Sequence, residues 1–191
     1  MSYLQNYYLE KCNIPSEINE HLPFLFKYAK ECESIIEMGT QDGVSIYALA
    51  YARPKILISI DILPFEGAEY LKELCEEQGT EYEHIIGSSL NLEIPEIDFL
   101  FIDTEHSYLQ LKSELKRHGN KAKKYLAFHD TVTFGFRDSN AYGDQGLRYE
   151  EGEPGRYGLI PAIQEFLIEN PHWEIDSINT NNNGMVFLKR K

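Results

Sequence analysis

Two hydrophobic periods alternate along the first two-thirds of the chain. Short apolar runs of strand length are separated by longer stretches whose apolar residues recur at helical spacing. The clearest run, Phe99–Ile102, is apolar without a break, which is typical of a strand buried on both faces of a parallel sheet. We expect the strands of this region at Ser34–Met38, Lys55–Ile60, Glu83–Ile86, Phe99–Ile102 and Tyr125–Phe128.

The intervening stretches and the C-terminal third complete the predicted architecture. Trp173–Ile178 and Met185–Lys189 are two further strands, and the Asn-rich segment Asn179–Gly184 between them indicates a hairpin. Strand–helix alternation predicts an α/β fold: a Rossmann-like three-layer sandwich with a seven-stranded, mostly parallel sheet and a C-terminal antiparallel hairpin. Helices are expected in Pro23–Cys32, Val44–Ala52, Gly67–Gln78, Tyr108–Arg117 and Ile160–Glu169.

The chain carries no internal signal for a domain boundary, so we expect one domain over residues 1–191. Residues 1–30 would form an N-terminal arm or helix. Residues 132–157 are rich in Gly, Asp, Arg and Tyr and have no clean period. A loop of that length in a compact domain is usually functional or disordered, and its aromatic and arginine side chains suit a lid over a polar acceptor.

Composition and charge narrow the class of protein. The chain is 42% hydrophobic and 26% charged, which is ordinary for a globular protein. A net charge of −13 argues against nucleic acid as the main partner, because phosphate binding needs a basic face. The absence of a long apolar run, of a signal pattern and of paired cysteines predicts a cytoplasmic protein that does not bind membranes. The tyrosines near the N-terminus could mediate a homo-oligomer.

Polar side chains follow two predicted strands at the point where each strand ends. Asp103 and then His106 come after the central apolar run, and His129 and Asp130 come after the next strand. The carboxyl ends of parallel strands meet at the edge where open α/β sheets bind ligands. We therefore expect these four side chains to converge. Each could instead be structural: a helix-start histidine, a core histidine or turn aspartates.

A glycine-containing turn follows the first strand. Gly39 and Gly43 stand at neither the dinucleotide spacing nor the phosphate-loop spacing, so no pyrophosphate cradle is predicted. Glu37, beside the turn, would repel a phosphate but attract an ammonium group. Asp61 ends the second strand, where such folds place an acid that binds ribose hydroxyls. A ribose and a cation without phosphates describe S-adenosylmethionine; alternatively, the glycines only turn the chain and Asp61 caps a helix.

Four motifs of the chain are similar to those of the class I S-adenosylmethionine-dependent methyltransferases. They are E-x-G-x-x-x-G-x-S, an acid after the second strand, I-D-x-x-H-S-Y and F-H-D-T. More narrowly, they resemble a metal-dependent small-molecule O-methyltransferase subgroup that includes cephalosporin-hydroxylase-like proteins and macrolide-sugar O-methyltransferases. The chain departs from these relatives at Lys123-Lys124-Tyr125, where they usually carry Gly-Gly.

The resemblance implies a role for each candidate residue. Glu37, Gly39 and Gly43 would line the methionine end of the cofactor, and Asp61 would hold the ribose. Gly87 and Ser88 would flank the adenine. Asp103 would contact the cofactor and, with Asp130, hold a divalent metal. His129, which stands where relatives often have a second acid, would be the third metal residue. His106 would be the general base.

The chemistry follows from these roles. The chain would transfer a methyl group to a hydroxyl of a small-molecule acceptor such as a sugar, a polyol or a catechol-like compound. Oxygen ligands favour Mg²⁺, and ligation by His129 would favour manganese or iron. The alternatives are a non-catalytic S-adenosylmethionine-binding regulatory module and a nicotinamide-dependent oxidoreductase, which Gln41 and Val44 disfavour because the dinucleotide motif needs glycine there.

Overall fold

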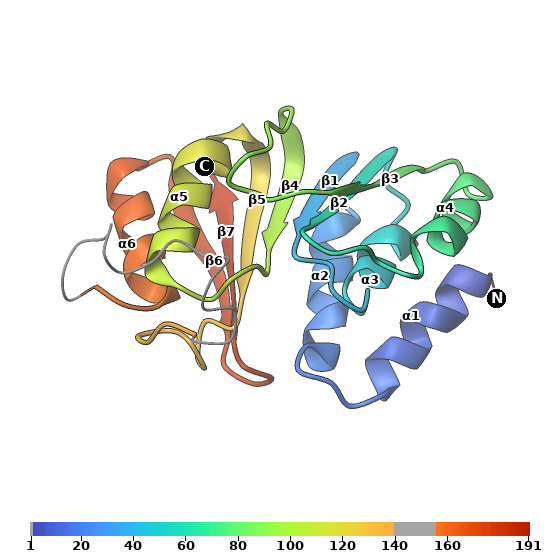
Figure 1. Ribbon diagram of the computed structural model, residues 1–191, viewed down its shortest axis with the longest axis horizontal. Helices are drawn as coiled ribbons and strands as arrows, with labels where there is room; N and C mark the ends of the chain where they lie inside the picture. Colours follow the sequence, from blue (N-terminus) through green and yellow to red (C-terminus); the bar gives the residue numbers. More distant parts are fainter. Residues whose placement is uncertain (1, 140–155) are drawn as a thin grey trace.

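The computed structural model describes residues 2–139 and 156–191. One seven-stranded sheet runs through the molecule in the order β3-β2-β1-β4-β5-β7-β6 (Figure 1). The central strand β4 is buried at almost every position, as its apolar run predicts. The strands are β1 Ser34–Met38, β2 Ile56–Asp61, β3 Glu81–Ile86, β4 Ile97–Ile102, β5 Ala122–His129, β6 Trp173–Asn179 and β7 Met185–Arg190.

The parallel part of the sheet and the C-terminal hairpin join at β5. Strands β1 to β5 pair in parallel, and β7 then pairs antiparallel with both β5 and β6. The hairpin therefore folds back so that β7 lies inside the sheet and β6 forms the edge. The predicted fold class and the pairing of the two C-terminal strands are confirmed.

Helices cover the sheet on both faces (Figure 1). Side chains of α1, α2, α3 and α4 form one apolar cluster with the first face, and those of α5 and α6 form a second cluster with the other face. Within the described residues, no helix has both the length and the apolar character that a membrane span requires. The helices are α1 Tyr3–Asn13, α2 Leu22–Ala29, α3 Ile46–Tyr51, α4 Ala68–Glu76, α5 Tyr108–His118 and α6 Leu159–Glu169, with short 3-10 turns at Asn19–His21 and Gly119–Lys121.

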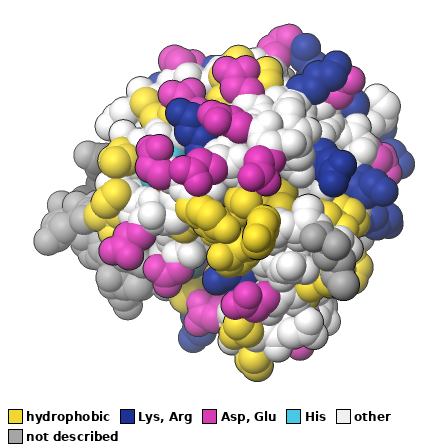
Figure 2. All heavy atoms as spheres, turned by 90° about the vertical axis from the view of Figure 1, so that its right-hand side faces the viewer, with side chains coloured by type: hydrophobic (Ala, Val, Ile, Leu, Met, Phe, Trp, Pro, Cys, Tyr) yellow, Lys and Arg dark blue, Asp and Glu magenta, His cyan; other side chains and the backbone are white. Residues whose placement is uncertain are grey.

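The N-terminal segment is a helix, and two of its tyrosines anchor it. Tyr7 stacks on Tyr47 of α3 with ring centroids 5.2 Å apart, while Tyr8 is buried. Tyr3 is exposed. On the α1 and α4 side of the molecule, acidic side chains lie above and below a group of hydrophobic ones (Figure 2). The packing of Tyr7 and Tyr8 explains their presence without a partner chain, and the homo-oligomer stays a prediction.

The predicted lid is only partly within the described residues. Its central part, residues 140–155, lies outside them, so its proposed closure stays untested, as does the single-domain assignment. The described ends are held together by Asp138, whose Oδ1 accepts hydrogen bonds from Tyr108 N at 2.9 Å and Gly158 N at 2.6 Å. This carboxylate fastens both ends of the loop to the start of α5.

Candidate functional site

The site lies at the carboxyl edge of the parallel strands. Strand β1 lies between β2 and β4, and β5 is the next strand along. The segments that follow these four strands begin with Gly39, Ile62, Asp103 and Asp130. The topology therefore brings the glycine turn and the two histidine–aspartate segments to a single edge, as the sequence predicts.

Only glycine fits at position 39. Its φ is +89°, and a Cβ there would lie 1.9 Å from the carbonyl oxygen of Asp103. The backbones of the two segments interlock, because Gly39 N donates to Ile60 O and Asp103 N donates to Met38 O, both at 2.8 Å. The first turn and the candidate metal segment are thus built against each other.

Gly43 also has a positive φ, +73°, but its free side is filled by protein. A Cβ there would lie 2.3 Å from the ring of Phe65. The ring of this phenylalanine, which the sequence did not single out, therefore occupies the space that we had assigned to a ligand. Gly43 shapes the turn, and its predicted contact with the cofactor stays a prediction.

Glu37 is fully buried at the end of β1. Its Oε1 accepts a hydrogen bond from Ser45 Oγ at 2.5 Å, while Oε2 has no hydrogen-bond partner among the described residues. Burial, reinforced by the charges of Asp103 and Asp61, raises the pKa of Glu37 to about 8 against the opposing effect of the Ser45 and Thr40 hydroxyl groups. An unpartnered carboxylate oxygen beside the glycine turn is suited to an ammonium ligand.

Asp61 supports the glycine turn directly. Its Oδ2 accepts hydrogen bonds from the backbone N–H groups of Thr40 and Gln41, both at 2.8 Å, and its Oδ1 accepts one from Leu63 N at 2.9 Å. A carboxylate has about four acceptor positions, so about one is left for a ribose hydroxyl. The alternative that Asp61 caps a helix is wrong, because neither α3 nor α4 has a side-chain cap; Asp61 instead supports the turn, and this role leaves room for the ligand role.

The predicted adenine residues lie on the neighbouring loop. Gly87 N donates to Asp61 O at 2.7 Å, which joins this loop to the end of β2. Ser88 Oγ accepts a weak hydrogen bond from Leu90 N at 3.3 Å. The side chains of Leu63 and Ile86 are more than half exposed near this edge, and they offer apolar surface.

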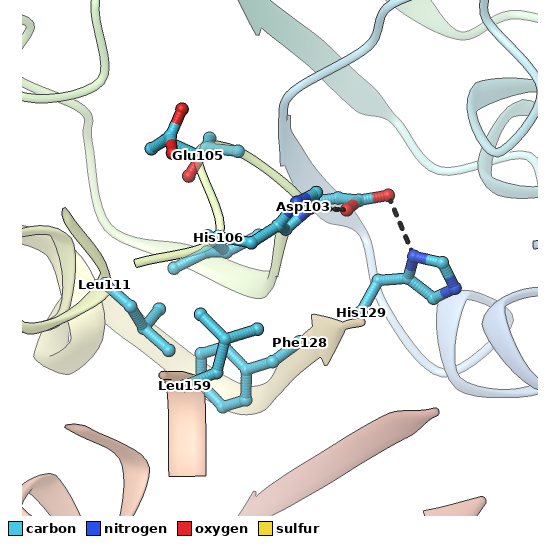
Figure 3. Close-up of a pocket in the computed structure, with 9 residues that line it drawn as sticks. Asp103, Glu105, His106, Leu111, Phe128, His129 and Leu159 are labelled. Carbon is cyan, nitrogen blue, oxygen red and sulfur yellow. Dashed lines mark hydrogen bonds and ion pairs between the residues drawn. The ribbon is translucent and has the colours of Figure 1, made fainter. Parts of the chain in front are cut away.

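The four predicted acid and histidine side chains meet, and Figure 3 shows three of them: Asp103, His106 and His129. His106 Nε2 lies 3.3 Å from Asp103 Oδ1 and 2.9 Å from Asp130 Oδ2. His129 Nδ1 lies 3.3 Å from Asp103 Oδ2 and 3.2 Å from Asp130 Oδ2. Asp130 has a φ of +60°, an uncommon backbone conformation for a residue other than glycine, and this turn follows directly after β5. We call these residues the acid–histidine cluster.

The donor atoms of the acid–histidine cluster fit a divalent cation. One donor atom each from Asp103, His129 and Asp130 lies within 4.8 Å of the other two. His129 Nδ1 is buried and contacts only the two carboxylates, and among the described residues the buried Asp130 Oδ1 has no hydrogen-bond partner. Buried polar atoms are rarely left in this state, and an ion at their centre would satisfy them.

Proton binding in the cluster is strongly coupled. Burial works to lower the pKa of both imidazoles, but the neighbouring carboxylates raise the pKa of His106 and of His129 to about 10. Burial likewise works to raise the pKa of Asp103 and of Asp130, but the two histidines lower it. Without a metal, two imidazolium ions neutralise the two carboxylates.

Two supporting features of the site gave no signal in the sequence. The ring of Phe134 stacks on His106, with centroids 4.8 Å apart and planes 6° apart, and so fixes the imidazole plane. Glu114, fully buried, accepts hydrogen bonds from Ser89 Oγ at 2.5 Å and Thr104 Oγ1 at 2.8 Å. This carboxylate ties the loop after β3 to the loop after β4.

Comparisons with known proteins agree on the fold. No family model and no curated protein sequence matches the chain. Among solved structures, the O-methyltransferase from Bacillus cereus in complex with S-adenosylhomocysteine has a TM-score of 0.60 at 14% identity, covering 98% of this chain and 90% of its own. A second structure is the O-methyltransferase TomG from Streptomyces achromogenes, which is involved in tomaymycin synthesis and was solved in complex with S-adenosylmethionine. Its TM-score is 0.59 at 15% sequence identity, and the match covers 93% of this chain and 82% of TomG. The S-adenosylhomocysteine-bound methyltransferase PaMTH1 from Podospora anserina has a TM-score of 0.56 at 14% sequence identity, and the match covers 98% of this chain and 87% of PaMTH1.

At these identities the likeness establishes the fold. The chain has the fold of S-adenosylmethionine-dependent methyltransferases over nearly its whole length. The resemblance expected from the sequence motifs is confirmed at that level, whereas the roles of the individual site residues stay predictions.

Proposed function

We propose that this protein is an S-adenosylmethionine-dependent, divalent-metal-assisted O-methyltransferase that acts on a hydroxyl of a sugar or another polyhydroxylated small molecule. The observation that carries the proposal is the acid–histidine cluster beside the glycine turn of a methyltransferase fold: three residues there offer donor atoms within 4.8 Å of one another, and the buried Asp130 Oδ1 has no hydrogen-bond partner among the described residues. A regulatory module without turnover has no need of such a cluster.

The cofactor would lie along the glycine turn. Glu37 Oε2 would accept a hydrogen bond from the ammonium group of the methionine moiety, because this buried oxygen has no partner within the described chain. Asp61 would accept from a ribose hydroxyl through its remaining acceptor position. Gly87 and Ser88 would flank the adenine, and the exposed side chains of Leu63 and Ile86 suit an aromatic base.

The acid–histidine cluster would perform the chemistry. S-adenosylmethionine, when bound, supplies the methyl group, and a divalent cation supplies the positive charge that lowers the pKa of an acceptor hydroxyl. Asp103, Asp130 and His129 would hold that cation. His106 would accept the acceptor's proton at Nε2, which faces the same two carboxylates.

His106 must be neutral to act as a base. The two carboxylates hold its proton as long as their charge is not matched by another cation. A divalent ion between them would remove that attraction and disfavour the imidazolium. The metal requirement and the base assignment therefore support each other.

The acceptor class follows from the same geometry. A cation held by two carboxylates and one imidazole keeps open coordination positions, which two vicinal oxygen atoms of a sugar, polyol or catechol can fill. This chelation would select polyhydroxylated acceptors over simple alcohols.

A turnover assay with binding controls tests the proposal. The protein is incubated with labelled S-adenosylmethionine, Mn²⁺ or Mg²⁺, and a panel of sugars, polyols and catechols, and S-adenosylhomocysteine release is measured. We expect acceptor-dependent release that excess chelator abolishes, while calorimetry shows that S-adenosylhomocysteine still binds in chelator and that NAD does not bind. Binding of NAD in place of S-adenosylhomocysteine would contradict the proposal, and binding without turnover of any acceptor would favour the regulatory module.

A further inference from the structure

The turn of the β6–β7 hairpin lies beside the acid–histidine cluster. Strand β7 pairs with β5 so that Met185 is opposite His129, which brings the preceding residues Asn181–Gly184 to the site edge. Asn182, Asn183 and Gly184 all have positive φ, at +45°, +69° and +91°. We call residues 181–184 the asparagine turn; the sequence indicated a hairpin here, and the proposed function leaves the turn without a role.

The asparagine turn holds the chain on both sides of Asp130. On one side, Asn182 O lies 3.1 Å from His129 Nε2. On the other side, Asn183 O accepts hydrogen bonds from Val132 N at 2.8 Å and Thr133 N at 3.1 Å. The geometry of the asparagine turn therefore fixes the positions of two candidate ligands, His129 and Asp130, at once.

Residues 16–21 of the N-terminal segment hold the asparagine turn by hydrogen bonds. Asn182 Oδ1 accepts a hydrogen bond from Glu20 N at 3.0 Å, and its Nδ2 donates to Ser16 O at 2.8 Å. His21 is fully buried, and its Nε2 lies 2.9 Å from Asn181 O and 3.0 Å from Asn182 O. The carbonyl group that faces His129 is thus part of a rigid, long-range hydrogen-bond network.

The Asn182 carbonyl decides which nitrogen of His129 can bind a cation. A carbonyl oxygen only accepts, so His129 Nε2 must carry a hydrogen to bond to it. A cation can then replace a proton only on Nδ1, which faces Asp103 and Asp130. A second ring nitrogen bonded to a backbone carbonyl is the usual arrangement of a metal-binding histidine.

We propose that the asparagine turn locks His129 as an Nδ1 ligand, and that the nitrogen ligand makes this site select a first-row transition ion such as Mn²⁺ over Mg²⁺. Imidazole is a poor ligand for Mg²⁺, which prefers oxygen, whereas Mn²⁺ accepts both carboxylate and imidazole ligands. The inference rests on the metal site of the proposed function and identifies the class of its ion.

Direct titrations of Mn²⁺ and Mg²⁺, without cofactor or acceptor, test the selectivity. We expect the wild-type protein to bind Mn²⁺ about tenfold or more tightly than Mg²⁺. His129→Asp should abolish that preference, because the ligand set becomes all oxygen. Asn182→Gly, which tolerates the positive φ but loses the clamp to Ser16 and Glu20, should weaken Mn²⁺ binding about tenfold. His118→Asn is the matched control, since His118 is a buried histidine that bonds to a backbone carbonyl, Ser89 O at 2.7 Å, away from the acid–histidine cluster.

A spectroscopic measurement on the wild-type protein tests the same inference without relying on variants that could fail to fold. With ¹⁵N-labelled imidazoles and the diamagnetic ion Zn²⁺, the Nδ1 resonance of His129 should move to the metal-bound range while Nε2 keeps its hydrogen. Equal affinity for Mg²⁺ and Mn²⁺, or metal binding through Nε2, would overturn this inference and leave the proposed methyl transfer standing. Failure to bind either ion would overturn both the inference and the metal dependence of the proposed function.

Discussion

The glycine turn after β1 and the acid–histidine cluster after β4 and β5 share one sheet edge but differ in how they are held. In the turn, backbone geometry is dominant: Gly39 has a positive φ against the Asp103 carbonyl, and Asp61 accepts hydrogen bonds from the turn's N–H groups. In the cluster, charge is dominant, because Asp103 and Asp130 face two histidines. Each region also keeps a buried carboxylate oxygen without a hydrogen-bond partner among the described residues: Glu37 Oε2 beside the turn and Asp130 Oδ1 in the cluster.

This difference separates the two contributions to function. Changes in the turn should lower stability or cofactor affinity, because they alter packing and backbone hydrogen bonds. Changes in the cluster should lower turnover and metal affinity with a smaller effect on folding, because one charged group is removed from a site open to an ion. Four variants test this contrast.

His106→Ala should have the largest effect on catalysis. We expect kcat to fall by about 10²–10⁴-fold, the usual range for the loss of a general base, with little change in Mn²⁺ affinity. Steady-state kinetics and metal titration measure the two quantities on the same preparation. Phe134→Leu, which removes the stacked ring but keeps the imidazole, is the control and should lose less activity. A His106→Ala enzyme with full activity would contradict the base assignment.

Gly39→Ala should have the largest effect on stability. The new Cβ meets the Asp103 carbonyl oxygen at 1.9 Å and also imposes a strained φ, so we expect a loss of about 3–5 kcal/mol in the free energy of unfolding. Gly79→Ala is a matched control, because Gly79 has a similar φ of +82° and nothing within 4 Å of the added Cβ. The control should lose about 1–2 kcal/mol, the cost of the backbone conformation alone. Equal losses in urea unfolding would show that the two segments do not interlock.

Glu37→Gln should change how stability depends on pH. The pKa of Glu37 is raised from 4.5 to about 8, so the folded state binds a proton that the unfolded state releases between these values. Its contribution to stability is therefore fully present below pH 4.5 and is lost as pH rises through 8. From pH 5 to 7.5, the free energy of unfolding of the wild-type protein should fall by about 3 kcal/mol relative to that of the variant, which has no titrating side chain at position 37. Parallel pH profiles of the two proteins would contradict the burial of an uncompensated carboxylate.

Asp61→Ala should have the smallest of these effects. With about one acceptor position available to the ribose, we expect S-adenosylhomocysteine binding to weaken by about 1–3 kcal/mol, including the loosening of the turn. Asp61→Asn keeps one acceptor oxygen and should show a smaller loss. Calorimetry measures both dissociation constants, and an unchanged value for Asp61→Ala would remove this residue from the cofactor site.

The sequence predicts the sheet well because its signals are local. The apolar run of β4 and the Asn-rich turn between the hairpin strands identify the elements, and strand ends place Asp103, His129 and Asp130 at one edge. The predicted boundaries miss residues at several ends: β5, for example, begins at Ala122 and not at Tyr125.

The partners of the site residues were not predictable, because they come from distant parts of the chain. Phe65 fills the space beside Gly43, Phe134 stacks on His106, and the Asn182 carbonyl bonds to His129 from 53 residues away. None of these contacts leaves a periodic or compositional pattern, since each depends on tertiary packing. Sequence motifs indicate where the chemistry lies, and the structure supplies what holds it in place.

Crystals grown with S-adenosylhomocysteine and Mn²⁺, with anomalous diffraction recorded at the manganese edge, test the account most directly. The account predicts an anomalous peak at ligand distance from Asp103, Asp130 and His129 Nδ1, with the cofactor along Gly39 and its ribose at Asp61. Manganese bound elsewhere, or a cofactor that avoids the glycine turn, would contradict it.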